Sequence, residues 1–291
     1  MAVYELGYRM WQGTHTPATS RFLVIPKYAL KPVFKSRAFN WFYIGSFLST
    51  VIFMAMLYVW HNLDVFKLLS DEHAEILSGI KYMKIDAEFF FIFFNIQSVL
   101  SFLIIFIVGP TLISVDMTNN ALPLYLSRPF SKAEYILGKM SVLIILLSPI
   151  TWVSGLIIYL FHCSLSVEPV FWAYIRIPIA LFVSFWLLIL FLSITILALS
   201  AYVKRKHVAR GIYLSLFFIL SGTGEVVNNI FHTTKGSLFR IHELFHSTAA
   251  RMFGVRAPDI PELPSYFILG GICVFCMFLL ERRIKPVEVV K

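Results

Sequence analysis

The stretch GPTLISVDMTNNALPLYLSRPFSKAEYILGK, Gly109–Lys139, decides how this chain is organised. It lies between two apolar runs, each of which is long enough for a membrane span, since a spanning helix needs about 20 apolar residues. We therefore interpret this stretch as a loop that joins two membrane helices. It is also the most patterned polar segment of the sequence, and a simple connection would need less pattern.

The composition predicts an integral membrane protein. Of the 291 residues, 58% are hydrophobic and 14% are charged, whereas soluble domains carry about 25% charged residues. The net charge of +9 would suggest nucleic-acid binding in a soluble protein. We exclude a nucleic-acid partner here because the basic residues flank apolar spans, where they set orientation in the bilayer.

Six apolar stretches are long enough to cross a membrane, so the predicted fold class is an all-α protein with six transmembrane helices. They form one predicted membrane domain, residues 39–281, after an N-terminal segment, 1–38, and before a tail, 282–291. The expected spans are 39–60, 89–115, 140–162, 177–203, 209–231 and 264–281.

The distribution of basic residues predicts the orientation. Lys and Arg gather before the first span, in segment 203–210 and in the tail, and these segments alternate with less basic loops. The positive-inside rule then places both termini in the cytoplasm of a multi-pass inner-membrane protein. The loop 231–263 is basic yet falls outside, but it is long enough for the rule to lose force.

The segment before the first span has the pattern of an amphipathic helix in the cytoplasmic membrane interface. Lys27, Lys31 and Lys35 recur every four residues and share one face, while apolar side chains line another. Pro32 is expected to kink or end this helix. A basic tail that only satisfies the positive-inside rule is the alternative interpretation.

The first half of the opening stretch is interpreted as a bent helix end. Gly109-Pro110 should bend the second span, and Ser114 and Asp116 follow as a candidate polar network. A carboxylate is unfavourable at a helix C-terminus, so Asp116 should have a cationic partner. We expect Arg128 or a basic residue of 203–210, and a solvated Asp116 is the alternative.

The second half predicts a short helix. Ser131 and Glu134 have the spacing of a capping box, so a helix should begin at Lys132. Gly138 is expected to break this helix before the third span. The product would be a short capped helix at the cytoplasmic surface, shaped for docking into a soluble partner.

The outer end of the fifth span carries a second polar group, Glu225, Asn228 and Asn229. Gly222 and Gly224 beside it suggest a broken or re-entrant helix. An ionisable group at membrane depth is often functional, so these residues are candidates for a translocation path or an outer gate. The alternative is the polar end of a helix that reaches water.

The opening stretch resembles the first cytoplasmic loop of ABC-2 type transporter permeases, on a set of residues within Ser114–Lys139. The likeness is greatest to the branch that contains the nitrous-oxide reductase maturation permease. The residues that carry it are Ser114, Asp116, Ala121, Leu122, Leu124 through Pro129, Ser131, Tyr135, Gly138 and Lys139.

This resemblance implies a type V exporter-like architecture. It implies a homodimer of six-helix subunits, each docked on a cytoplasmic ATP-binding subunit that holds ATP and magnesium. The short helix would be the coupling helix. The residues expected at this docking site are Arg128, Pro129, Ser131, Lys132, Glu134, Tyr135, Gly138 and Lys139.

No phosphate-binding loop accompanies Gly138-Lys139. Ala133 stands where that motif needs a glycine, and Met140 follows where it needs Ser or Thr. We therefore expect a non-catalytic subunit without a cofactor of its own. Export is the expected direction, and the sequence does not name the substrate.

A rival interpretation rests on HELFH, 242–246, which fits a zinc-binding pattern. On a helix His242 and His246 would face one way, with Glu243 as the general base of a membrane metalloprotease. We prefer an amphipathic interfacial helix whose apolar side chains face lipid. A further alternative is an anchor that passes force to a partner on the periplasmic side without transporting anything.

Overall fold

The computed structural model describes residues 17–62, 85–121, 125, 131–166, 170–258 and 260–284. These residues form helices and no strands, and six helical stretches are long and apolar enough to cross a membrane. The predicted fold class is therefore confirmed. The six stretches are Arg37–His61, Ala87–Thr118, Lys132–Leu165, Arg176–Tyr202, Lys206–Phe231 and Glu262–Arg283.

Two of the six spans contain more than one helix. The first consists of α2 (Arg37–Ser46) and α3 (Leu48–His61), and the third consists of α8, a π-helical turn η3 and α9. The bounds in the third span are Lys132–Leu147, Pro149–Val153 and Ser154–Leu165. The other spans are α6 (Ala87–Thr118), α11 (Arg176–Tyr202), α12 (Lys206–Phe231) and α14 (Glu262–Arg283). The shorter elements are η1 (Ala18–Leu23), α1 (Val24–Phe34), α10 (Val170–Ala173), η4 (Lys235–Phe239) and α13 (Ile241–Phe253).

The core lies between α6 and α11, because both helices are apolar on most of their circumference. Of the six spans α11 is the most buried, as expected for a helix that is hydrophobic all round. Aromatic rings fill the contact: the Phe94 and Phe185 centroids lie 5.0 Å apart, and those of Phe93 and Phe185 lie 6.2 Å apart.

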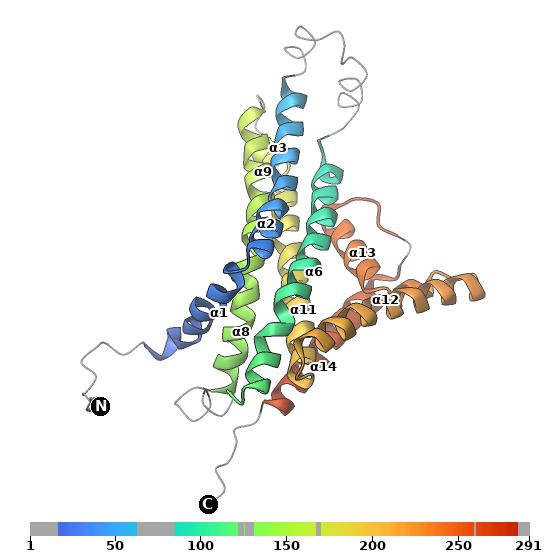
Figure 1. The fold of residues 1–291 in the computed structure, drawn as a ribbon. Coiled ribbons are helices and arrows are strands. Elements are labelled where there is room, and N and C mark those ends of the chain that lie inside the picture. The colour runs from blue at the N-terminus through green and yellow to red at the C-terminus, as the bar shows by residue number, and fades with distance from the viewer. Residues whose placement is uncertain are drawn as a thin grey trace, which may run out of the picture.

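The last two spans are much less buried than the core. α12 leaves the bundle at a steep angle, and α13 returns to pack against it (Figure 1). Large apolar side chains on both spans are exposed, including Phe218 and Phe231 on α12 and Phe267 and Phe275 on α14. In a bilayer such surfaces contact lipid or another subunit.

Four features gather at one end of the bundle in Figure 1: α1, the start of α8, the turn between α11 and α12, and the end of α14. This arrangement is expected for six spans that alternate in direction, because every second connection and both ends of the chain then lie on the same side. The helix predicted before the first span is present as η1 and α1, with Lys27 and Lys31 exposed and Ile25 buried. It ends two residues after Pro32, as the ring of that proline favours.

Two expected helix breaks are absent. α8 runs through Gly138 without interruption, so there is no separate short helix, and the third span begins at Lys132 rather than at 140. α12 likewise runs through Gly222 and Gly224 to Phe231. A glycine costs a helix interior only about 1 kcal/mol, and the surrounding apolar run outweighs this cost.

Candidate functional site

The start of α8 is fixed by its own side chains. The Glu134 N–H donates to Ser131 Oγ at 3.2 Å, and the Ser131 N–H donates to the Glu134 carboxylate at 2.6 Å. This reciprocal pair is the predicted capping box, and it satisfies two amide groups that a helix leaves unpaired. The prediction that a helix begins at Lys132 is confirmed.

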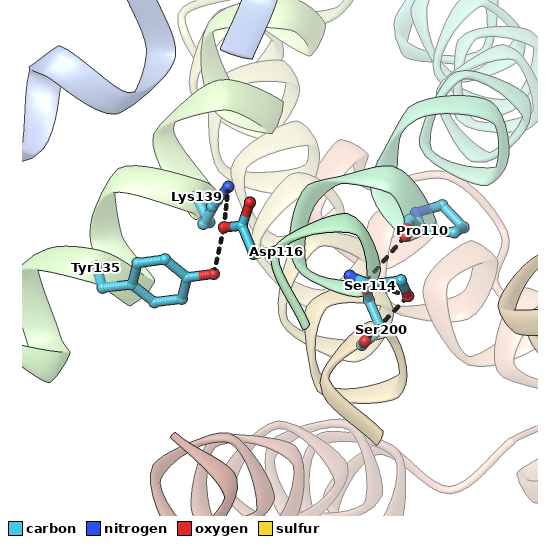
Figure 2. Close-up of polar contacts among 6 residues, drawn as sticks. All are labelled: Pro110, Ser114, Asp116, Tyr135, Lys139 and Ser200. Atoms are coloured by element: carbon cyan, nitrogen blue, oxygen red, sulfur yellow. Dashed lines mark hydrogen bonds and ion pairs between the residues drawn. The ribbon is translucent and has the colours of Figure 1, made fainter. Parts of the chain in front are cut away.

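Two side chains of α8 hold the end of α6. Lys139 Nζ lies 2.7 Å from the Asp116 carboxylate, and the Tyr135 hydroxyl donates to the same carboxylate at 2.7 Å. Tyr135 and Lys139 are four residues apart and therefore share one face of α8, from which both reach Asp116 (Figure 2). We call these three residues the α6–α8 joint.

The structure pairs Asp116 with Lys139, a partner that the sequence did not suggest, and with none of the basic residues of 203–210. The other expected partner, Arg128, lies outside the described residues, as does Pro129, so that expectation stays a prediction. Lys139 is 4% exposed and Tyr135 is fully buried. A buried ammonium group needs a partner, so Lys139 is part of the fold rather than a surface anchor.

Tyr125 lies beside the joint. Its ring centroid is 5.5 Å from that of Tyr135 and 5.9 Å from Lys139 Nζ. Burial, and secondly the nearby Asp116 carboxylate, raise the pKa of Tyr125 above its usual value. Loss of the Tyr125 proton beside the joint is therefore disfavoured.

Ser200 of α11 enters the backbone ladder of α6. The Ser114 N–H donates to Ser200 Oγ at 2.9 Å, and Ser200 Oγ donates to the Pro110 carbonyl at 3.1 Å (Figure 2). These two backbone groups would pair directly in a regular α-helix, so one hydroxyl bridges them. Ser114 Oγ also donates to the Val203 carbonyl at 2.6 Å. The predicted polar network at Ser114 therefore ties α6 to α11.

Gly138 allows the N-terminal segment to cross α8. A Cβ atom there would lie 2.5 Å from Ile25 Cδ1 and 3.0 Å from the Phe22 carbonyl oxygen. The glycine is therefore required for close approach and not for a break. Sequence reasoning identified the residue but assigned it the wrong physical role.

A second cluster joins α12 to η4 and α13. Arg240 lies 3.0 Å from Glu225 and 2.6 Å from Glu243, and the Asn228 amide donates to Ser237 Oγ at 3.1 Å. We call Glu225, Arg240 and Glu243 the α12–α13 cluster. A Cβ on Gly224 would lie 2.6 Å from the Gly236 carbonyl oxygen, so this glycine also marks a close crossing. The third predicted residue, Asn229, is exposed.

The HELFH segment lies on α13. The rings of His242 and His246 are 6.3 Å apart, His246 packs 4.7 Å from Phe91, and the Glu243 carboxylate is occupied by Arg240. Across the described ranges no group of three or more His, Cys, Asp or Glu residues could hold a metal ion, and Asp259 is outside them.

The orientation expected for α13 was wrong. Its apolar residues pack into the protein rather than facing lipid: Leu244 is fully buried, and the Phe245 ring lies 5.0 Å from that of Phe191 on α11. α13 thus packs between α12 and the core helices α6 and α11.

These features define a multi-pass α-helical membrane protein. Polar contacts tie the end of α6 to α8 and α11, and tie the end of α12 to α13. A family model described as ABC-2 family transporter protein matches residues 34–245, well over half of the chain. The chain therefore belongs to the ABC-2 transporter family and is a membrane subunit of a transporter. The comparison with curated protein sequences returned no match.

Proposed function

We propose that this chain is the non-catalytic permease subunit of an ATP-driven exporter. A separate cytoplasmic ATP-binding subunit, which holds ATP and magnesium, docks on the start of α8. The observation that carries the proposal is the continuity of α8: a capped surface end leads without a break to the buried Asp116–Lys139 pair.

The contacts define a route for force. Ala133 and Leu137 are exposed on the first two turns of α8, whereas Tyr135 and Lys139 on the other face hold Asp116. A push on the exposed face therefore moves the end of α6. α6 passes the motion to α11 through the Ser114–Ser200 contact. The permease has two arrangements of these helices, and the ATP-bound partner shifts the equilibrium toward the one that it contacts better.

The remaining parts of the proposal concern assembly and topology. Two copies of the chain form the transporter, in the inner membrane, with the end that carries α1 and the start of α8 in the cytoplasm. The exposed apolar faces of α12 and α14 supply surface for lipid and for the second copy. The likeness to the nitrous-oxide reductase maturation branch supports export. A force-transmitting anchor with a periplasmic partner remains the alternative.

The docking proposal is tested by placing a charge on the exposed face of α8. We expect Ala133→Glu with Leu137→Glu to abolish stimulation of the ATP-binding subunit and transport in proteoliposomes, with the protein still folded. Lys27→Gln on α1 is the control, because it changes a charge at the same end of the molecule. Unchanged stimulation in the double variant would remove the docking site from α8.

The separate-subunit proposal is tested by the chain alone. Purified without its partner, it should release no phosphate from ATP in the presence of magnesium. Hydrolysis that follows this chain through purification would contradict the proposal.

A further inference from the structure

A groove of about 680 Å³ lies between α1, the end of α6 that carries Asp116, and the first turns of α12. Its volume is within the range of about 300–1,000 Å³ typical of small-molecule sites. Most of its walls are apolar. The apolar lining residues include Ile25, Ala29 and Val33 from α1 and Ile107, Val108 and Val115 from α6.

One rim of the groove is strongly basic. Lys206 and Arg210 line it from the same face of α12, and Lys139 lines it from α8. Among the described lining residues Asp116 is the single carboxylate, and Lys139 already neutralises it. Two positive charges on α12 are therefore left for a ligand.

Arg210 is oriented by the protein but not saturated. One of its terminal nitrogens donates to the Ile107 carbonyl at 2.7 Å, and its buried Nε has no hydrogen-bond partner. The Ile107 contact thus orients the guanidinium and leaves its Nε–H available to donate to a ligand. α12 begins at this rim, so the positive end of its helix dipole lies there. The N-cap residue, Arg205, makes no side-chain cap, which leaves the first backbone N–H groups of the helix without a capping side chain.

We propose that this groove binds an anionic phospholipid. The phosphate lies against Lys206 and Arg210 at the start of α12, and an acyl chain lies between α1 and α6. Basic pockets between membrane helices recognise anionic headgroups in this way. The bound lipid connects α1 to α12, and this does not depend on the proposed ATP-binding partner.

Charge and shape favour a lipid over other occupants. A free phosphate would use the basic rim but leave the apolar walls in water. A two-fold contact centred on this groove would bring the same cations of both copies together at the symmetry axis. A phospholipid satisfies the rim and the walls at once.

The test measures thermal unfolding of the full-length protein in detergent during titration with phosphatidylglycerol, phosphatidylcholine or soluble glycerol phosphate. Only phosphatidylglycerol should raise the midpoint temperature. In Lys206→Gln with Arg210→Gln the apparent affinity for phosphatidylglycerol should fall about 10- to 100-fold, as expected for the loss of two basic contacts to an anionic headgroup.

Two further variants make the test decisive. Lys204→Gln with Arg282→Gln removes the same charge from exposed residues outside the groove lining, and should bind phosphatidylglycerol normally. Val115→Trp fills the groove and leaves its cations in place, and should lose binding. Val115 is exposed, so this variant decides the matter if the Lys206 and Arg210 variant fails to fold.

Three results would overturn the proposal. An equal response to phosphatidylcholine would show that the basic rim does not recognise the headgroup. An equal response to glycerol phosphate would show a simple anion site. Conversion of a dimer to monomers by Lys206→Gln with Arg210→Gln, measured by light scattering, would show that a second copy occupies the groove.

Discussion

The α6–α8 joint and the α12–α13 cluster are built from similar parts in different surroundings. Each has a carboxylate held by a cation, close to a glycine that lets another segment approach. The side chains of Lys139 and Asp116 are 6% and 14% exposed, whereas those of Arg240 and Glu225 are 30% and 56% exposed. Loss of the ion pair should therefore cost much more stability in the α6–α8 joint than in the α12–α13 cluster.

The physical reason is the cost of an unpaired charge. Removing one partner of a buried ion pair leaves the other charge without water or a counter-ion, whereas an exposed partner is simply rehydrated. This difference fits the role proposed for the α6–α8 joint, because a joint that transmits force must hold during the cycle.

The largest expected effect is in the joint. Lys139→Met should destabilise the protein by on the order of 3 kcal/mol, because Asp116 would remain buried at the negative end of α6. Thermal unfolding in detergent measures this loss. Asp116→Asn combined with Lys139→Met should recover much of it, and a single variant as stable as the parent would refute the comparison.

The glycine of the joint should give the next largest effect. Gly138→Val would drive side-chain atoms into Ile25 and the Phe22 carbonyl, and overpacking of this kind costs about 1–3 kcal/mol. We expect η1 and α1 to detach, which faster tryptic cleavage at Lys27 and Lys35 would report. Gly45→Val is the matched control, since nothing lies within 4 Å of a Cβ at Gly45.

The α12–α13 cluster should be less sensitive. Arg240→Gln is expected to cost less than about 1 kcal/mol, because Glu225 remains hydrated when its partner is lost. In 1 M salt, where exposed ion pairs are screened, the parent protein should lose about as much stability as the substitution removes. The Arg240→Gln variant should show no such loss in salt. A loss as large as that of Lys139→Met would make the two regions equivalent.

The smallest effect concerns pH. Burial, and secondly His242, lower the pKa of His246 below its ordinary value of 6.5, against the opposing influence of Glu243. The folded protein therefore favours neutral His246, and the stability from this site is present above pH 6.5 and is lost as the pH falls below it.

His246→Phe should flatten the fall in unfolding temperature between pH 7 and pH 5 by removing the group that takes up a proton on unfolding. His242→Gln should keep most of that fall, because it leaves the buried ring in place. If the two variants behave alike, His246 is not the source of the pH dependence.

Much of the fold could be predicted because the decisive signals are local. A run of apolar residues identifies a span by its length alone, and Ser131 with Glu134 marks a helix start within one turn. The errors came from residues whose meaning depends on distant neighbours. A glycine that breaks a helix and one that admits another segment look alike in sequence, and Gly138 and Gly224 are of the second kind.

The candidate site was predicted in part for the same reason. Asp116 was correctly expected to need a cation, since a helix C-terminus repels a carboxylate. The choice of Lys139 required the relative placement of α6 and α8, which no local pattern contains. Likewise, the amphipathic pattern of α13 indicated an apolar face but not whether lipid or α11 covers it.

The π-helical turn at Pro149–Val153 has a consequence for how the third span tolerates change. The Val153 N–H donates to the Ser148 carbonyl five residues earlier, and Gln97 of α6 donates to the carbonyl of Ile150. Such a turn holds one residue more than the α-helix around it. Deleting one residue there would restore ordinary winding and leave α9 facing the same neighbours. The same deletion in α8 would rotate everything beyond it by about 100°. Length variation in this span should therefore be accommodated at the π turn and not within α8.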